Sequence, residues 1–258
     1  MKKGDFFKGV YQMDMMTKDL SLEGKLPVFY YDNTAMTAIF TAPVEKVRKH
    51  LPLPEMHPVE AWKGKALVAF TAFEYRKTDI DPYNEFSISF PITFGRRVIP
   101  GLTVLSMMLK RYFMAYVWQL PVTTERARKG GVELYGYPKF LADITFSQEG
   151  SMLACNLSEG GEKILTLKGK KLKTSPEKTN RFKTFSVKDG IPLAANVYMN
   201  PLEFGKSMNP GAAQLSLGDK HSIALQLRDL DLSKKPIFFQ YMPFMEAILY
   251  GPRNLMDD

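Results

Sequence analysis

The chain has 258 residues, of which 45% are hydrophobic and 24% are charged. This balance is typical of a folded globular protein and excludes collagen-like and disordered architectures. The 35 Lys and Arg residues outnumber the 27 Asp and Glu residues and give a net charge of +8. Such a charge favours small anionic ligands but is modest for a nucleic-acid-binding protein, so we expect no nucleic-acid partner.

Cysteine and histidine counts restrict the chemistry. The chain has one cysteine, Cys155, and three histidines, which argues against a disulfide framework and a zinc cluster, so we expect no metal and no cofactor. The lysine-rich start is not followed by an apolar segment, which predicts no secretory signal and a cytoplasmic location. The most apolar stretch, residues 99–122, contains Lys110 and Arg111, so we expect no membrane span.

The first half of the chain predicts strands with two short helices. Residues 43–51 predict a helix that begins near Pro43 and ends before Pro52. Residues 123–131 predict a second helix, because they combine a threonine cap, an early acid, late bases and a terminal glycine pair. Alternating or aromatic-rich apolar residues predict strands over residues 35–40, 66–75, 86–94 and 111–119.

The second half predicts short strands at regular spacing. The turn pairs Gly150-Ser151, Gly160-Gly161 and Asp189-Gly190 indicate hairpin connections, and residues 245–250 predict a final helix. The predicted strands cover residues 140–147, 152–157, 163–167, 182–187, 194–199, 213–217 and 222–230. We therefore expect a mainly antiparallel β protein (β-rich α+β) with a few short peripheral helices. The sheets would form a closed barrel or a two-sheet sandwich in one domain over residues 1–258.

Residues 131–141 form the most informative stretch. A Gly-Tyr-Pro turn presents Lys139 among aromatic and aliphatic side chains at the start of a strand. An apolar collar disfavours the charged ammonium form of a lysine, and a neutral amine can attack a ketone to form a Schiff base. The alternative is a surface lysine whose aliphatic stem lies along apolar neighbours.

Two motifs carry a family resemblance. Residues 133–139 (Glu-Leu-Tyr-Gly-Tyr-Pro-Lys) and 82–85 (Pro-Tyr-Asn-Glu) resemble the acetoacetate decarboxylase family. The resemblance implies that Lys139 forms the Schiff base with the substrate ketone and that Glu85 lies in the active site. It also implies a cone-like closed sheet and a homo-oligomer. Glu85 would shuttle protons at the enamine carbon, a task suited to a carboxylate; otherwise it is a solvated acid at a strand start.

The chain departs from the family pattern at three positions. Phe140 stands where the family has a second lysine, whose positive charge activates the first. The family's active-site arginine aligns near Asn33 and its other glutamate near Thr71, for which Glu74 is a possible substitute. A replacement cation would come from Arg96, Arg97 or Arg111.

Further side chains are candidates for substrate binding. Tyr135 and Tyr137 are either core residues or phenolic donors to a substrate carboxylate, and we expect one of the two to be a core residue. Phe140 is a candidate pocket wall, and Gln240 or Tyr241 from the aromatic segment near the carboxyl end can reach a substrate.

The sequence therefore predicts a lyase that acts on a small keto acid through a Schiff base at Lys139, as acetoacetate decarboxylase does. One alternative is an aldolase or dehydratase that uses the same lysine on a pyruvate-like substrate. The other is a barrel that binds a small molecule without catalysis, because fold alone does not establish activity.

Overall fold

The computed structural model describes residues 5–17 and 22–257. The helices are a short 3-10 turn η1 (Asp5–Phe7), α1 (Val44–Arg48), α2 (Leu102–Lys110), α3 (Glu125–Tyr135) and α4 (Ser222–Asp229). The strands of the first half are β1 (Met13–Thr17), β2 (Leu22–Leu26), β3 (Val28–Pro43), β4 (Met56–Pro58), β5 (Glu60–Trp62), β6 (Lys65–Thr78), β7 (Tyr83–Phe94) and β8 (Tyr112–Gln119). Those of the second half are β9 (Asp143–Glu149), β10 (Met152–Glu159), β11 (Glu162–Lys170), β12 (Asn180–Lys188), β13 (Ile191–Ser207), β14 (Ala213–Leu217), β15 (Phe238–Leu249) and β16 (Arg253–Asn254).

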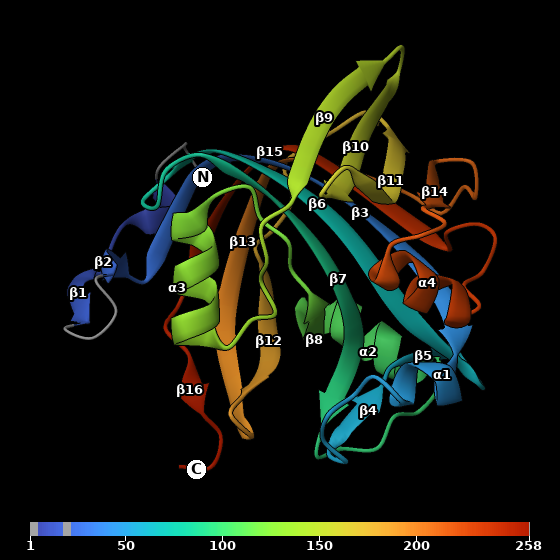
Figure 1. Cartoon of the computed structure of the whole chain (residues 1–258), viewed down its shortest axis with the longest axis horizontal. Helices are drawn as coiled ribbons and strands as arrows, with labels where there is room; N and C mark the ends of the chain where they lie inside the picture. Colours follow the sequence, from blue (N-terminus) through green and yellow to red (C-terminus); the bar gives the residue numbers. More distant parts are fainter. Residues whose placement is uncertain (1–4, 18–21, 258) are drawn as a thin grey trace.

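Seven long strands close into a barrel in the order β7-β8-β12-β13-β15-β3-β6, and the pairing of β6 with β7 completes the ring (Figure 1). Neighbouring barrel strands run antiparallel except β8 and β12, which are parallel. A separate antiparallel sheet, β14-β11-β10-β9, lies against one side of the barrel (Figure 1). The predicted mainly antiparallel β fold is confirmed. Of the two predicted architectures, a closed barrel and a two-sheet sandwich, the closed ring of strands is the barrel.

The period of two along the strands gives β3, β6 and β7 two faces that both pack against other parts of the protein. On one face of β3, β6 and β7, residues such as Met36, Phe70 and Ile88 form a large core with the four-stranded sheet and α4. On the other face, residues such as Ala35 and Tyr75 meet side chains of β12, β13 and β15 in a second core. Because β13 lies across the ring from β6 and β7, the second core fills the barrel interior.

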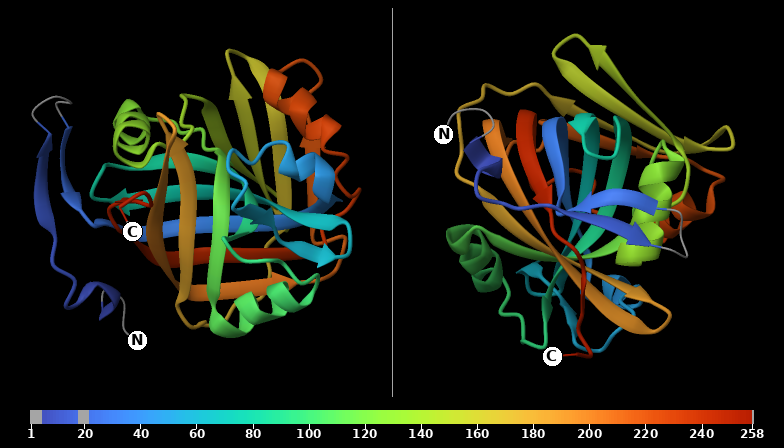
Figure 2. Two further views of the ribbon diagram at one scale, coloured as in Figure 1. Left: turned by 90° about the horizontal axis from the view of Figure 1, so that it is seen from below. Right: turned by 90° about the vertical axis from the view of Figure 1, so that its left-hand side faces the viewer.

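One end of the barrel carries α3, the loop that follows it and the β1–β2 hairpin (Figure 2). The helix ends at Gly136, whose φ of 59° is a left-handed conformation that glycine adopts without strain. Among the described residues, none of the helices is both long and apolar enough to cross a membrane.

Most predicted elements are confirmed, including the three hairpins at Gly150, Gly160 and Asp189, but two are wrong. Residues 222–229 form helix α4 rather than a strand, because His221 caps the first turn and the buried residues recur at helical spacing. Residues 245–249 continue β15 rather than form a helix, because β15 hydrogen-bonds to strands on both sides. Helix α2 was not predicted.

Candidate active site

The loop after α3 fixes the position of Lys139. Its backbone pairs with the segment after β8: the Leu120 amide donates to the Pro138 carbonyl at 3.3 Å, and the Val122 amide donates to the Phe140 carbonyl at 2.9 Å. Lys139 lies between these two bonds, and its side chain is only 7% exposed. The sequence also allowed a surface lysine whose ammonium group reaches solvent. That interpretation does not match this burial.

Glu85 meets Lys139 inside the barrel end. Lys139 Nζ donates to Glu85 Oε2 at 2.7 Å, and the Glu85 side chain is 9% exposed. The hydroxyl of Tyr75 on β6 donates to the other carboxylate oxygen, Oε1, at 3.1 Å. The two residues that the sequence singled out, 54 positions apart, therefore form one buried ion pair held by a phenol.

Three tyrosines form an aromatic wall beside this pair. The ring centroids of Tyr30 and Tyr75, and of Tyr75 and Tyr83, are each 4.7 Å apart, and Lys139 Nζ lies 5.6 Å from the centroid of Tyr83. Burial, then the nearby Glu85 carboxylate, raises the pKa of Tyr75 and of Tyr83 well above the usual range. Both hydroxyls are therefore protonated and neutral, and the wall adds no charge to the site.

A cavity of about 60 Å³ opens beside Lys139, and α3, the β1–β2 hairpin and Tyr30 of the tyrosine wall contribute to its lining. At roughly 10–15 Å³ for each water-sized group, it has room for about four to six such groups. Lys25 and Arg126 border it. Arg126 Nη1 also donates to Asp81 Oδ2 at 2.7 Å, which holds the guanidinium near the rim.

A glycine in α3 makes room for the lysine. A Cβ added at Gly131 would lie 2.3 Å from Lys139 Cδ and 2.5 Å from Cε. Carbon atoms pack at about 3.5–4.0 Å, so no larger residue fits while the lysine keeps this path. The glycine pair predicted to end the helix instead lies inside it, where Gly131 allows Lys139 to pass.

Comparisons with known proteins agree with this fold. A sequence model described as acetoacetate decarboxylase matches residues 17–241. The chain belongs to the acetoacetate decarboxylase family. No curated protein sequence matches it significantly.

Solved structures of the family share the barrel at low identity. An acetoacetate decarboxylase superposes with a TM-score of 0.64 at 17% identity, covering 89% of both chains. The acetoacetate decarboxylase of Legionella pneumophila subsp. pneumophila str. Philadelphia 1 gives 0.62 at 15% identity, covering 89% of this chain and 88% of that one. The enduracididine biosynthesis enzyme MppR, complexed with the condensation product of pyruvate and imidazole 4-carboxaldehyde, gives 0.63 at 14% identity, covering 89% of both chains.

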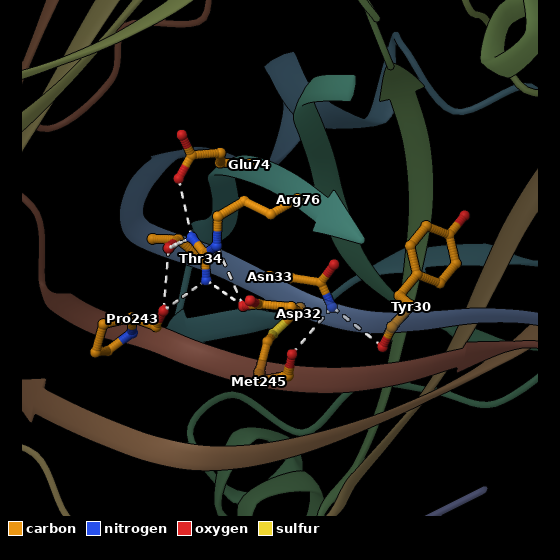
Figure 3. A network of polar contacts seen from close by, with 8 residues as sticks. All are labelled: Tyr30, Asp32, Asn33, Thr34, Glu74, Arg76, Pro243 and Met245. Atoms are coloured by element: carbon orange, nitrogen blue, oxygen red, sulfur yellow. Dashed lines mark hydrogen bonds and ion pairs between the residues drawn. The ribbon is translucent and has the colours of Figure 1, made fainter. Parts of the chain in front are cut away.

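Asn33, which aligns near the active-site arginine of the family, has a structural role in this chain. Asn33 is fully buried, and its Nδ2 donates to the carbonyls of Tyr30 at 3.3 Å and Met245 at 3.0 Å (Figure 3). Strand β3 shifts register against both β6 and β15 around this residue. The Asn33 amide thus supplies backbone hydrogen bonding at an irregular crossing of three strands.

Five other predicted residues lie away from the Lys139–Glu85 pair. Arg96 and Arg97 are exposed beyond the far end of β7, about 30 Å along the strand from Glu85 at about 3.3 Å per residue. Arg111 pairs with Glu177 at 2.7 Å in a separate surface groove. Glu74 and Tyr241 lie on the opposite faces of their strands, Tyr241 in the large core with the four-stranded sheet.

Glu74 belongs to a surface network instead. Arg76 Nη1 lies 3.0 Å from Glu74 Oε2, and Arg76 also bonds Asp32, Thr34 and the Pro243 carbonyl (Figure 3). This network ties β6 to β3 and β15 outside the interior.

Glu74→Gln is therefore expected to leave chemistry at Lys139 unchanged, because the Glu74 side chain is 38% exposed and faces away from the cavity. Initial rates of ketone adduct formation, compared with the wild-type protein, measure this. A large loss of rate would instead place Glu74 in the site.

Several residues of the site were not found by sequence reasoning. Tyr83 lies within the 82–85 motif and shares a strand face with Glu85 at a spacing of two, which is a usable signal. Tyr75 and Tyr30 join it only through strand pairing, and Lys25 and Arg126 through the packing of α3 and the hairpin. Phe140 was predicted as a pocket wall, and it packs against the large core.

Proposed function

We propose that this chain is a cofactor-independent carbon–carbon lyase that forms a Schiff base between Lys139 and the ketone of a small keto acid. One observation carries the proposal: Lys139 Nζ and Glu85 Oε2 form a 2.7 Å contact, with both side chains less than 10% exposed, beside a small cavity. Membership of the acetoacetate decarboxylase family supports the same reaction class.

The buried pair can hold its proton on either partner. With the proton on nitrogen, the site holds an ammonium and a carboxylate; with the proton on Glu85, it holds a neutral amine and a carboxylic acid. Transfer of one proton across the 2.7 Å contact yields the neutral amine nucleophile without any change in the net charge of the site. This route does not need the family's second lysine.

The chemical steps balance through these two groups. The Lys139 amine adds to the ketone carbon, and loss of one water gives the iminium. In decarboxylation, the electron pair of the carbon–carboxylate bond moves to the iminium nitrogen, releasing carbon dioxide and leaving an enamine. The proton that Glu85 held leaves in the water lost on iminium formation, so Glu85 takes up one proton from solvent and donates it to the enamine carbon. One water then hydrolyses the resulting iminium, which frees the ketone and the amine and returns the released proton to Glu85.

The tyrosine wall has two uses in this scheme. Tyr75 holds Glu85 Oε1, which leaves Oε2 directed at the reacting nitrogen. The rings of Tyr75 and Tyr83 exclude water around the iminium, where hydrolysis before carbon–carbon cleavage would waste the intermediate.

Aldol or dehydration chemistry on a pyruvate-like substrate is the second candidate. The chain has Phe140 after the lysine, and the similar structure of MppR contains a condensation product of pyruvate and an aldehyde. In this version, Glu85 removes a proton from the carbon next to the iminium, and the enamine attacks an aldehyde carbonyl. Both candidates share the Lys139 adduct and differ after it.

Borohydride trapping with intact-mass detection tests the proposal. Borohydride reduces an iminium to a stable amine, so pyruvate or acetoacetate should add a defined mass, and peptide mapping of the wild-type adduct should locate it at Lys139. Lys139→Ala should abolish the adduct. Lys188→Ala is the matched control, because Lys188 lies in the same region but donates to the Glu133 backbone at 2.7 Å. Carbon dioxide release from acetoacetate then separates decarboxylation from aldol chemistry.

An adduct that persists in Lys139→Ala, or no adduct with any keto acid, would contradict the proposal. The second result would favour the non-catalytic small-molecule-binding barrel. The single-domain organisation, homo-oligomer and cytoplasmic location expected from the sequence stay predictions.

A further inference from the structure

Two stacked tyrosines before Lys139 differ in what their hydroxyls bind. The rings of Tyr135 and Tyr137 are 5.2 Å apart and nearly parallel, at 6°. The Tyr137 hydroxyl lies 2.6 Å from Thr184 Oγ1, which itself donates to the Ala195 carbonyl at 3.2 Å. Because the single hydroxyl proton of Thr184 is used there, Tyr137 is the donor to Thr184. The proton of the Tyr137 hydroxyl is therefore used in a hydrogen bond to barrel strand β12.

The Tyr135 hydroxyl is different. It is buried and has no hydrogen-bond partner among the described residues, in a side chain that lines the cavity beside Lys139. The residue is only 4% exposed. A buried phenol without a partner lowers stability, so such groups are rare. The cavity that Tyr135 shares with Lys139 offers a bound ligand as the missing partner.

We propose that the Tyr135 hydroxyl donates a hydrogen bond to the carboxylate of the keto acid bound at Lys139. This inference rests on the proposed function and adds the residue that recognises the carboxylate of the keto acid.

The chemistry of the bound substrate selects the carboxylate. Iminium formation expels the ketone oxygen as water, so the carboxylate is the polar group that a simple keto acid retains. Burial raises the pKa of Tyr135 above its usual range, so the hydroxyl is a neutral donor. Lys25 at the cavity border gives this end of the site a favourable potential for an anion, whereas the charge of Arg126 is paired with Asp81 at 2.7 Å. A neutral donor holds a carboxylate without the strong charge pairing that would oppose its loss as carbon dioxide.

Tyr135→Phe and Tyr137→Phe form a matched pair for the test. The concentration of pyruvate that gives half-maximal borohydride trapping should rise about 10-fold or more in Tyr135→Phe, the loss expected for a hydrogen bond to a charged group. The corresponding concentration of acetone, which has no carboxylate, should not change. Tyr137→Phe should retain the wild-type preference for pyruvate. The melting temperature should stay unchanged in Tyr135→Phe and should fall in Tyr137→Phe, because of these two hydroxyls only that of Tyr137 has a hydrogen-bond partner in the protein.

Unchanged pyruvate trapping in Tyr135→Phe would overturn the inference. An equal loss for pyruvate and acetone would also overturn it, since the hydroxyl would then act on the reacting carbonyl or on the fold. Binding of butyrate, measured by ligand-observed NMR, keeps the inference separate from catalysis because butyrate has no ketone. If the wild-type protein forms no adduct, the proposed function fails. Weaker butyrate binding in Tyr135→Phe would still support the carboxylate contact, and equal binding would overturn it.

Discussion

Glu85→Gln is expected to lower turnover by about 10²- to 10⁴-fold, the range that positioned acid–base side chains contribute. Glutamine has the shape of glutamate and keeps an oxygen that can accept the Tyr75 hydroxyl, which lies 3.1 Å from Glu85 Oε1. It cannot take the proton of the Lys139 ammonium or return one to the enamine carbon. Initial rates with acetoacetate and pyruvate measure the loss.

Glu133→Gln is the matched control for this substitution. Glu133 lies in the same 133–139 motif and pairs with Lys188 at 3.4 Å, with a side chain that is 38% exposed. Neutralising it should leave turnover unchanged. Wild-type turnover in Glu85→Gln, or equal losses in both variants, would remove Glu85 from the mechanism. Borohydride trapping in Glu85→Gln separates the steps, because slow adduct formation indicates that Glu85 acts before the iminium.

Local sequence signals predicted the parts of this protein that depend on local geometry. Alternation along residues 86–94 predicts a two-faced strand, and the Asp189-Gly190 pair predicts a hairpin, because both need only neighbouring residues. The failures lie where the local signal is ambiguous. Residues 245–249 suit a helix in isolation, but β13 and β15 pair along this segment. Tertiary pairing overrides such weak preferences.

The residues of the site also fall into two classes, those with a local sequence signal and those brought together by long-range strand pairing. Lys139 and Glu85 carry motif signals, whereas Tyr30, Tyr75 and Tyr83 meet only because β6 pairs with both β3 and β7. That register is a long-range property, and a one-residue slip would turn Tyr75 out of the interior. The prediction that Arg96, Arg97 or Arg111 supplies a cation at the site was wrong for the same reason. Arg96, for example, follows Glu85 along the chain but lies beyond the other end of β7. Cations on α3 and β2 border the cavity instead.

Gly131→Ala is expected to disable the site with little change in the fold. The added methyl carbon would lie 2.3 Å from Lys139 Cδ, so the lysine side chain must leave its path or α3 must move. A displacement of about 1 Å at a reacting group can cost about 10²-fold in rate. Overpacking costs about 1–3 kcal/mol, and alanine recovers up to about 1 kcal/mol over glycine inside a helix. We therefore expect a small loss of melting temperature and a large loss of Lys139 adduct formation with pyruvate.

Gly130→Ala separates a displaced lysine from a general effect on α3. Gly130 is the neighbouring helix residue and borders the same cavity, but a Cβ there would meet no atom within 4 Å. Gly130→Ala, which adds the same methyl group, should form the adduct as the wild-type protein does. It should also raise thermal stability, because only the helix propensity changes. If Gly131→Ala trapped pyruvate as fast as Gly130→Ala, the path of Lys139 past α3 would not be required for chemistry. If instead only Gly131→Ala lost the adduct, the small residue in α3 would be a requirement for a buried, reactive lysine at this position.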